Sequence, residues 1–511
     1  RVVRKETRTL DCPVFTEQGI LFKKEGIEMK RIVTLLLAAG LVLGAAAGSQ
    51  AADIKAKGLW EFSWEVGDNT FAENSGKDKF TAVQRLRTQI DVIASESLKG
   101  VVFFEIGDQN WGKSSDGASL GNDGKVVKVR YSYVDWVIPQ TDAKVRMGLQ
   151  NFSLPGFITN NPVLGGGSAD GAGITVSGQF TENVGASLFW LRAENDNNGE
   201  YRNGVAVEED GHYSSNAMDF VGLTVPLTFD GVKVTPWAMY GTIGRDSFEG
   251  AGDVSGQKKS AMINRLLPVL HEGQDPYGSD LDRHGNAWWV GVASELTYFD
   301  PFRFALDAAY GSVDMGSTRW DGRNFDMERA GWFASILGEY KMDYFTPGIL
   351  FWYASGDDKS PYNGSERMPT IEGSWAVSSY GFDDNYGRVS CDMLGLSNTG
   401  TMGVYLQAKD ISFMEDLTHI FRVGFVKGTN NTEMVRHGDW AGIDSTDGVY
   451  LTTADKAWEV NFDTQYKIYQ DLTLGVELGY INLDLDENVW QNVNDYRENN
   501  FRGAVTLKYA F

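Results

Sequence analysis

The sequence contains little cysteine, little histidine and no long apolar run. Its 511 residues include two Cys and five His, and no Cys/His cluster has the spacing of a metal site. The longest apolar run covers residues 32–47, which is shorter than the roughly 20 residues that a membrane-spanning helix needs. These scarcities argue against an internal disulfide, a metal centre and a helical membrane bundle.

Positive charge is also scarce. The 46 Lys and Arg are outnumbered by 69 Asp and Glu, which gives a formal net charge of -23. Nucleic acid is therefore not an expected partner. The five His residues show no recognisable Ser/His spacing, and the glycine-rich residues 165–171 lack the Gly-Lys-Ser/Thr end of a phosphate loop. We therefore predict no enzyme activity, no catalytic residues, and no cofactor or metal.

Residues 29–51 have the layout of a secretory signal peptide. A basic start at residues 29–31 precedes the apolar run, and small residues at 49–51 form a cleavage site. We expect cleavage after Ala51, and we expect residues 1–28 to be upstream sequence translated from a wrong start. The expected mature chain, 52–511, keeps 38 basic and 64 acidic residues and a single, unpaired cysteine, Cys391.

The final stretch, residues 500–511, alternates between two faces. Phe501, Leu507 and Phe511 fall on one side of an extended chain, while Arg502 and Lys508 fall on the other. This period of two predicts a strand. An apolar face toward lipid, a polar face toward water and an aromatic end are typical of a transmembrane β-barrel strand.

Strands of this kind recur along the whole mature chain. We predict an all-β, antiparallel transmembrane barrel of 18 strands, or of 16 if the hairpin at 330–356 belongs to a loop. The predicted strands are 54–66, 80–94, 101–111, 125–138, 143–152, 172–181, 185–195, 217–228, 232–244, 286–298, 302–313, 330–342, 345–356, 400–410, 417–429, 455–468, 472–484 and 498–511.

The predicted connections alternate between short and long. Tight turns such as 139–142, 229–231, 299–301 and 469–471 alternate with loops of about ten to more than forty residues, as in outer-membrane barrels with short periplasmic turns and long external loops. Aromatic residues near the short turns predict an interfacial girdle: Tyr298, Phe299, Phe302, Tyr344, Phe345 and Tyr469. The barrel must close, because hydrocarbon offers no partner for an unpaired strand edge.

Residues 152–171 are expected to narrow the channel. This loop follows the fifth strand, is moderately apolar, and has Asp170 as its only charge, so it is expected to fold against the inner wall. Its position resembles the constriction loop of general and sugar-specific porins. The alternative is an ordinary surface loop or a subunit contact.

A basic sector is predicted on the inner wall near this loop. Its six members fall on the lumenal face of strands two, four and five: Arg85, Arg87, Lys128, Arg130, Lys144 and Arg146. We expect them to attract anions and to face Asp170 and other acids across the pore, including Glu61, Glu105 and Asp307. The alternative is a wet polar wall whose cations form local ion pairs.

Two further groups of residues concern the lumen and the external surface. Aromatic residues assigned to the inner face by parity give only weak support for a sugar path: Trp190, Trp289, Phe333, Trp352 and Tyr405. Acidic residues of the long loops, among them Asp357, Asp358, Asp383 and Asp384, are expected to form a solvated external rim.

The chain resembles the outer-membrane porins, and most closely the homotrimeric porins of sulfate-reducing bacteria. The resemblance rests on the start at Met29, the opening ADIKAKGLWEFSW, the segment VRMGLQNFSLPGF and the aromatic terminus. It implies three barrels per assembly, with residues 112–124 as a candidate latch, and passive diffusion of small hydrophilic solutes. The ending Tyr509-x-Phe511 resembles the assembly signal of bacterial outer-membrane barrels, so periplasmic chaperones and the barrel-assembly machinery are expected partners, beside outer-membrane lipid and lipopolysaccharide.

Three functions remain open at this point. The chain is predicted to be a general porin of the bacterial outer membrane that passes ions and small hydrophilic solutes. The alternatives are a channel specific for a sugar or an organic anion, and a non-conducting adhesin or scaffold barrel.

Overall fold

The computed structural model describes most of the expected mature chain. The described residues are 52–72, 79–122, 124, 126–167, 169–195, 201–202, 205–206, 217–245, 247–248, 265–268, 283–320, 322–387, 392–437, 444–445 and 448–511. The expected upstream extension, the signal peptide and Cys391 lie outside these residues.

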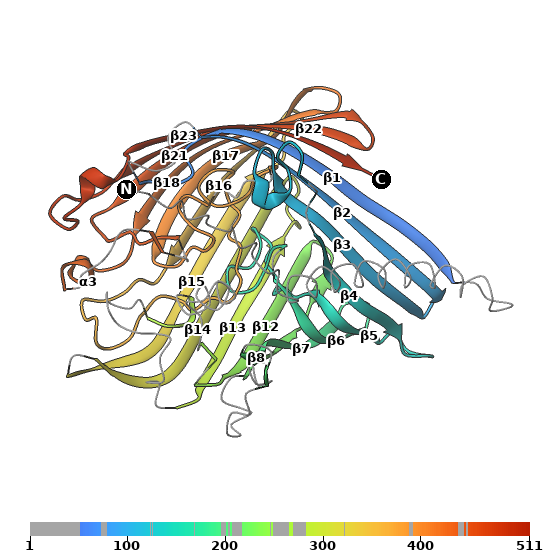
Figure 1. The fold of residues 1–511 in the computed structure, drawn as a ribbon, viewed down its shortest axis with the longest axis horizontal. Helices are drawn as coiled ribbons and strands as arrows, with labels where there is room; N and C mark the ends of the chain where they lie inside the picture. Colours follow the sequence, from blue (N-terminus) through green and yellow to red (C-terminus); the bar gives the residue numbers. More distant parts are fainter. Residues whose placement is uncertain are drawn as a thin grey trace, which may run out of the picture.

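The described chain is built almost entirely of antiparallel strands (Figure 1). The strands of the main sheet are β1 (Asp53–Gly67), β2 (Lys79–Ser95), β3 (Leu98–Asn110), β4 (Val127–Val137), β5 (Lys144–Asn151), β6 (Asp170–Gln179), β7 (Gly185–Asn195), β10 (Ala217–Thr224), β11 (Leu227–Phe229), β12 (Val232–Ile243), β13 (Gly285–Leu296), β14 (Phe302–Trp320), β15 (Arg323–Tyr340), β16 (Thr346–Ala354), β17 (Thr401–Met414), β18 (Leu417–Gly428), β21 (Lys456–Tyr469), β22 (Leu472–Asp484) and β23 (Asn499–Ala510).

The remaining elements are short and lie in connections. They are two hairpins, β8 (Tyr201–Arg202) with β9 (Val205–Ala206) and β19 (Asp444–Ser445) with β20 (Gly448–Val449), the 3-10 helices η1 (Ser114–Asp116) and η3 (Val493–Asp495), and the helix α3 (Thr432–His437). Within the part of the chain that the structure describes, no helix is long and apolar enough to cross a membrane.

The main sheet closes on itself. Each strand pairs with its neighbour in sequence, and β1 also pairs with β23, with Leu59 opposite Ala510 and Gly67 opposite Arg502. Because β10 and β11 both pair with β12 and follow one another, they form one position in the wall. The barrel therefore has 18 strands, and the predicted strand count and closure are confirmed. The hairpin at 330–356, for which the alternative was a loop, is formed by β15 and β16, and both are full strands of the wall.

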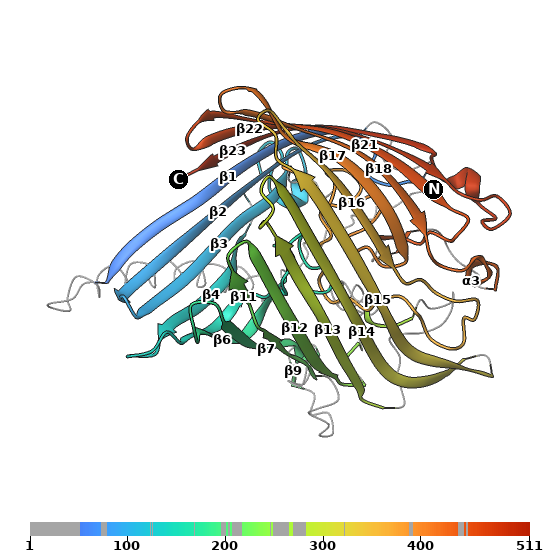
Figure 2. The ribbon, with the colours of Figure 1, turned by 180° about the vertical axis from the view of Figure 1, so that it is seen from behind.

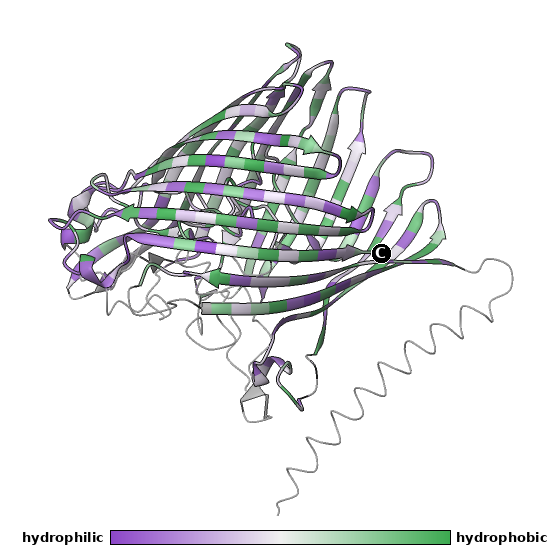
Figure 3. Ribbon diagram, turned by 90° about the horizontal axis from the view of Figure 1, so that it is seen from above, coloured by the Kyte–Doolittle hydropathy of each residue, from purple (hydrophilic) through white to green (hydrophobic). Residues whose placement is uncertain are grey.

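The two faces of the wall differ in chemistry. Figure 3 shows hydrophilic and hydrophobic residues alternating along the strands. On β21, Trp458, Val460 and Phe462 are exposed on the outer surface, whereas Glu459 and Asp463 are buried inside. An outer face of this kind suits hydrocarbon, and a polar inner face suits an aqueous lumen, the space that the wall encloses.

Short turns and long connections alternate at the two ends of the barrel, as predicted, with one exception. The connection between β14 and β15 was expected to be a loop at 314–329, but both strands continue to Trp320 and Arg323 and form a long hairpin (Figure 2). Its pairing shifts between Asp314 and Ser317. The six predicted girdle aromatics are all exposed at the short-turn end.

Candidate functional site

The six predicted cations lie on one sector of the inner wall, and most of them bind carboxylates of adjacent strands. On β2, Arg85 Nε lies 2.9 Å from Glu61 Oε2, and Arg87 Nε lies 2.8 Å from Glu105 Oε2. Glu61 and Glu105 belong to β1 and β3, which flank β2. The expectation that these two acids stand across the pore is therefore wrong: they neutralise the cations beside them.

Arg130 and Asp170 also meet directly. Arg130 Nε donates to Asp170 Oδ2 at 2.8 Å, and the same guanidinium donates to the carbonyl oxygen of Gly167. Asp170 is the first residue of β6, so it is part of the wall and not an opposing charge on the loop. Lys128, two residues before Arg130, is exposed near the start of β4, at the end of the barrel that carries the long loops.

The lower end of the sector keeps accessible positive charge. Arg146 Nε donates to Asp135 Oδ1 at 2.6 Å, and Lys144 Nζ lies 2.9 Å from Asp135 Oδ2. Two cations thus share one carboxylate, and the side chains of Arg146 and Lys144 remain 31% and 40% exposed. The Arg146 guanidinium also lies over the Tyr133 ring, 4.1 Å from its centroid.

The segment 152–169 crosses the lumen from β5 to the wall six strands further on (Figure 1). At its tip, the backbone N–H groups of Phe157 and Ile158 donate to the Asp307 carboxylate at 3.1 and 2.9 Å. Arg303 donates to the Phe157 carbonyl at 2.7 Å. Both wall residues belong to β14, so Asp307 is the one expected acid that does stand away from the cationic sector.

A second segment, of which residues 355–387 and 392–400 are described, also lies inside the barrel. It pairs with the first segment, because the N–H of Ile371 donates to the Val163 carbonyl at 2.9 Å and the N–H of Gly165 donates to the Glu372 carbonyl at 2.9 Å. Leu164 and Glu372 form a parallel bridge. Together the two segments, which we call the inner loops, form a partition across the lumen.

Three buried carboxylates of β21 and β22 hold the second inner loop. Glu459 accepts from Ser378 Oγ at 2.9 Å and from the N–H of Gly381 at 2.9 Å. Asp463 accepts from Ser379 Oγ at 2.8 Å, and Glu477 accepts from the N–H of Tyr386 at 2.6 Å.

Aromatic packing holds the same loop against the nearby strands β15, β16 and β17. Trp375 lies edge-on to Trp352 and Phe333, with ring centroids 5.8 and 6.2 Å apart. Phe382 lies edge-on to Trp352 at 5.8 Å and packs near Tyr405. These wall aromatics are fully buried beneath the loop and offer no open path for sugars.

Two predictions from sequence are wrong at these positions. Trp190 pairs with Ile174 and Val221 on the outer surface and is 38% exposed there, so it does not line the lumen. The expected solvated rim is wrong for Asp357, which is buried and accepts from Tyr450 Oη at 2.7 Å, whereas Asp358 is exposed. Burial and the Asp357 charge raise the pKa of Tyr450, which keeps this phenol a hydrogen-bond donor.

The sequence held a signal for the second inner loop. Residues 373–382 contain no charge and include Trp375, Val377, Tyr380 and Phe382. The same criterion, an apolar loop with few charges, singled out 152–171. Asp357, Asp358, Asp383 and Asp384, in contrast, favoured a solvated surface for 355–400.

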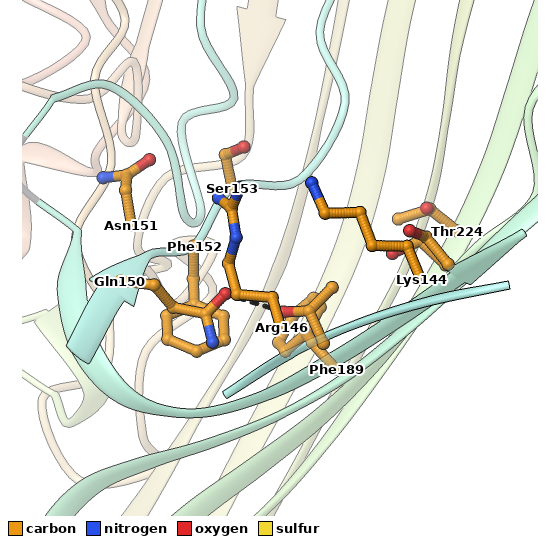
Figure 4. Close-up of a pocket in the computed structure, with 11 residues that line it drawn as sticks. Lys144, Arg146, Gln150, Asn151, Phe152, Ser153, Phe189 and Thr224 are labelled. Carbon is orange, nitrogen blue, oxygen red and sulfur yellow. Dashed lines mark hydrogen bonds between the residues drawn. The ribbon is translucent and has the colours of Figure 1, made fainter. Parts of the chain in front are cut away.

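A cavity of about 290 Å³ remains beside the first inner loop, on the wall formed by β5, β6, β7 and β10 (Figure 4). Lys144 and Arg146 extend into it side by side, and Phe152 and Phe189 lie below them. The rest of the lining is uncharged and mostly hydroxyl- or amide-bearing: Gln150, Asn151, Ser153, Thr175, Ser177, Ser187 and Thr224. This site can hold a small polar molecule in contact with two cations.

Other candidate chemistry receives no support. Residues 107–114 have the spacing Gly-x4-Gly-Lys-Ser, but residues 107–110 belong to β3 and only the three-residue η1 follows, so the strand, loop and helix of a phosphate loop are missing. Within the described residues, no three His, Cys, Asp or Glu side chains are placed to hold a metal ion.

Comparisons with known proteins support the fold. No protein-family model and no curated protein sequence matches the chain. The structure of Acinetobacter baumannii OccAB3 superposes with a TM-score of 0.50 at 11% identity, over 90% of this chain and 99% of that one. Pseudomonas aeruginosa OccK11 (OpdR) and OprD each give a TM-score of 0.48, at 11% and 10% identity, over 90% of this chain and over 96% and 95% of theirs.

The chain therefore has the fold of the bacterial outer-membrane porins. Its closed wall, apolar outer face and exposed aromatic rim are those of a protein of the bacterial outer membrane. The three structures come from Acinetobacter and Pseudomonas, so the narrower resemblance to porins of sulfate-reducing bacteria stays a prediction.

Proposed function

We propose that this protein is a solute-specific channel of the outer membrane that passes small hydroxylated organic anions, such as sugar acids. The observation that carries the proposal is the polar cavity beside the partition. A general porin needs an open lumen, whereas here the inner loops pack against each other and are hydrogen-bonded to β14 and β21 of the wall. Solute must then pass through a narrow route, where side chains replace part of its hydration shell.

The lining of the cavity favours an anion with hydroxyl groups. Lys144 and Arg146 share the single carboxylate of Asp135. Asp135 neutralises only one of the two positive charges, so the group keeps a net charge of about +1. Hydroxyl and amide groups on the surrounding strands provide donors and acceptors for a polyol. Higher on the same wall, Arg85, Arg87 and Arg130 are already paired with Glu61, Glu105 and Asp170, so the attraction for an anion is concentrated at Lys144 and Arg146.

The test uses the purified protein in a planar bilayer, with glucuronate or glucose added during recording of the ion current. Glucuronate should block the current saturably, and glucose should block it much less. The K144S/R146S variant should weaken the glucuronate block by about tenfold or more, because a hydrogen bond to a charged group contributes about 1.5–3 kcal/mol.

The matched variant is D135N, which frees the same two cations and should strengthen both the block and the preference for anions. Conductance without saturable block by any organic anion would leave a general porin as the better description. A chain that inserts but carries no current would overturn the channel itself and favour the scaffold barrel.

A further inference from the structure

A pair of lysines ends the apolar surface of β18 and β21 on the outside of the barrel. Lys427 and Lys456 are directly opposite each other in the strand pairing. Next to them on the same face are Phe425 opposite Trp458, and then Val423 opposite Val460. Because these pairs alternate with the buried Val426, Gly424 and Arg422, the lysines point away from the lumen.

The height of the pair places it at the outer membrane surface. The outward row begins near the short turn with Leu417 opposite Tyr466 and ends at Lys427 opposite Lys456, ten residues later. At about 3.3 Å per residue and a strand tilt of about 40°, ten residues rise about 25 Å, which is the height of the apolar band of a transmembrane barrel. The lysines therefore lie level with the headgroups of the outer leaflet.

The charge at this position is poorly compensated. Like charges opposite each other on adjacent strands destabilise a sheet unless an anion lies between or beside them. Lys456 Nζ lies 2.9 Å from Asp484, but no carboxylate of the described residues lies within ion-pair distance of Lys427. By contrast, other outward-facing cations at the same rim have a carboxylate of their own: Arg192 binds Asp219 at 2.9 Å, and Arg283 binds Asp314 at 2.6 Å.

The surroundings of the lysines suit a lipid. The Phe425 and Trp458 rings lie 4.7 Å apart directly below the pair and form an apolar platform. Beside it, Asn482 and Tyr480 both donate to Asn499 Oδ1, at 3.1 and 2.6 Å, and continue a polar row across β22 and β23. A headgroup bearing phosphate can meet the lysines and the polar row while its acyl chains contact the two rings.

We propose that Lys427 and Lys456 bind a phosphate of an outer-leaflet glycolipid headgroup, of the lipid A type. The phosphate supplies the negative charge that the described residues do not place beside Lys427. The glycolipid is favoured over free phosphate because the site combines cations with an apolar platform at the membrane surface. This inference concerns the outer surface and does not depend on which solute the channel passes.

The experiment uses the full-length protein extracted in mild detergent, with bound lipid counted by native mass spectrometry after titration with lipid A. The K427S/K456S variant should bind lipid A at least about tenfold more weakly than the unchanged protein, in line with the attraction of anionic lipid for two lysines. Trp458→Ala should weaken binding of lipid A without creating affinity for inorganic phosphate.

The matched control is R283S, which removes a cation from the same rim where a carboxylate already accompanies it, and which should retain lipid A. Migration of the unheated barrel in SDS gels checks that each variant folds. Equal binding by the double variant and by R283S would overturn the proposal. Competition by inorganic phosphate as strong as that by lipid A would also overturn it, because the site would then recognise a free anion.

Discussion

Asp307 illustrates how much one side chain contributes to the shape of this channel. Its carboxylate accepts the backbone N–H groups at the tip of the first inner loop, and Arg303 holds the adjacent carbonyl group. These bonds tie the loop to a wall strand far from the strand it leaves. The width of the passage beside β5 thus depends on a residue of β14, six strands away along the wall.

Replacing Asp307 by Ala should release the loop tip. Each hydrogen bond to a charged group contributes about 1.5–3 kcal/mol, so the loop should leave the wall for part of the time, and the single-channel conductance should rise. Liposome swelling with neutral sugars of increasing size should show a higher size limit. Asp307→Asn keeps one acceptor oxygen and should give an intermediate result, while unchanged conductance in Asp307→Ala would show that other contacts hold the tip.

The sequence predicted the face of most of these residues but not their partners. Alternation along a strand assigns Arg85, Arg130 and Arg146 to the lumen, and the structure places them there. Which carboxylate each one meets depends on the pairing between strands, which shifts between Phe103 and Phe104 and between Gln84 and Leu86. Periodicity within one strand reveals neither the register that sets Glu61 opposite Arg85 nor the shift that precedes Arg87 and Glu105, so both acids were expected on the wrong side of the pore.

At the scale of elements, the second inner loop is the largest departure from expectation. Strands could be predicted because each repeats a simple pattern over about ten residues, and all 18 appear in the structure. A loop has no period, and its location is decided by partners that are distant in sequence. Glu459 and Asp463 lie on the lumenal face of β21, but nothing in their own strand indicates that Ser378, Ser379 and Gly381 bind them.

Trp375→Ala should loosen this element. Removing a large buried aromatic side chain typically costs about 3–5 kcal/mol, and Trp375 joins the loop to Trp352 and Phe333 on the wall. We expect a higher and noisier single-channel current, and faster tryptic cleavage after Arg367, which is buried in the closed arrangement. Trp458→Ala removes a tryptophan from the outer face and should leave both measurements unchanged; equal effects of the two substitutions would contradict the proposed role of the loop.

At the scale of the whole molecule, the junction between β1 and β23 completes the barrel. Phe511 exchanges backbone hydrogen bonds with Gly58 at 2.8 and 3.0 Å, and its ring lies near Trp60 and Tyr509. A side chain at Gly58 would collide with the Phe511 ring and with the carbonyl of Arg87. The final residue therefore belongs to the wall, in addition to its expected part in assembly.

The two roles of Phe511 can be separated by experiment. Phe511→Ala keeps the backbone pairing, so the purified chain should still refold in detergent with a modest loss of stability. In cells, the amount of heat-modifiable barrel in the outer membrane should fall severalfold if Tyr509 and Phe511 form the signal read by the assembly machinery. Phe501→Ala, on the same face of the same strand, is the control, and an equal fall for both would show that only wall packing matters.

The second inner loop also touches this junction from inside. Arg502 of β23 binds Glu65 of β1 at 2.8 Å and donates to the Ser379 carbonyl of the loop at 3.1 Å. Tyr380 Oη donates to the carbonyl of Asp68, just beyond β1, at 3.0 Å. The loop thus contacts both the first and the last strand on the lumenal side of the place where they pair. A substitution that displaces the loop and opens the passage for solute should also make β1 and β23 easier to separate. Permeability and mechanical strength are therefore expected to change together in this protein.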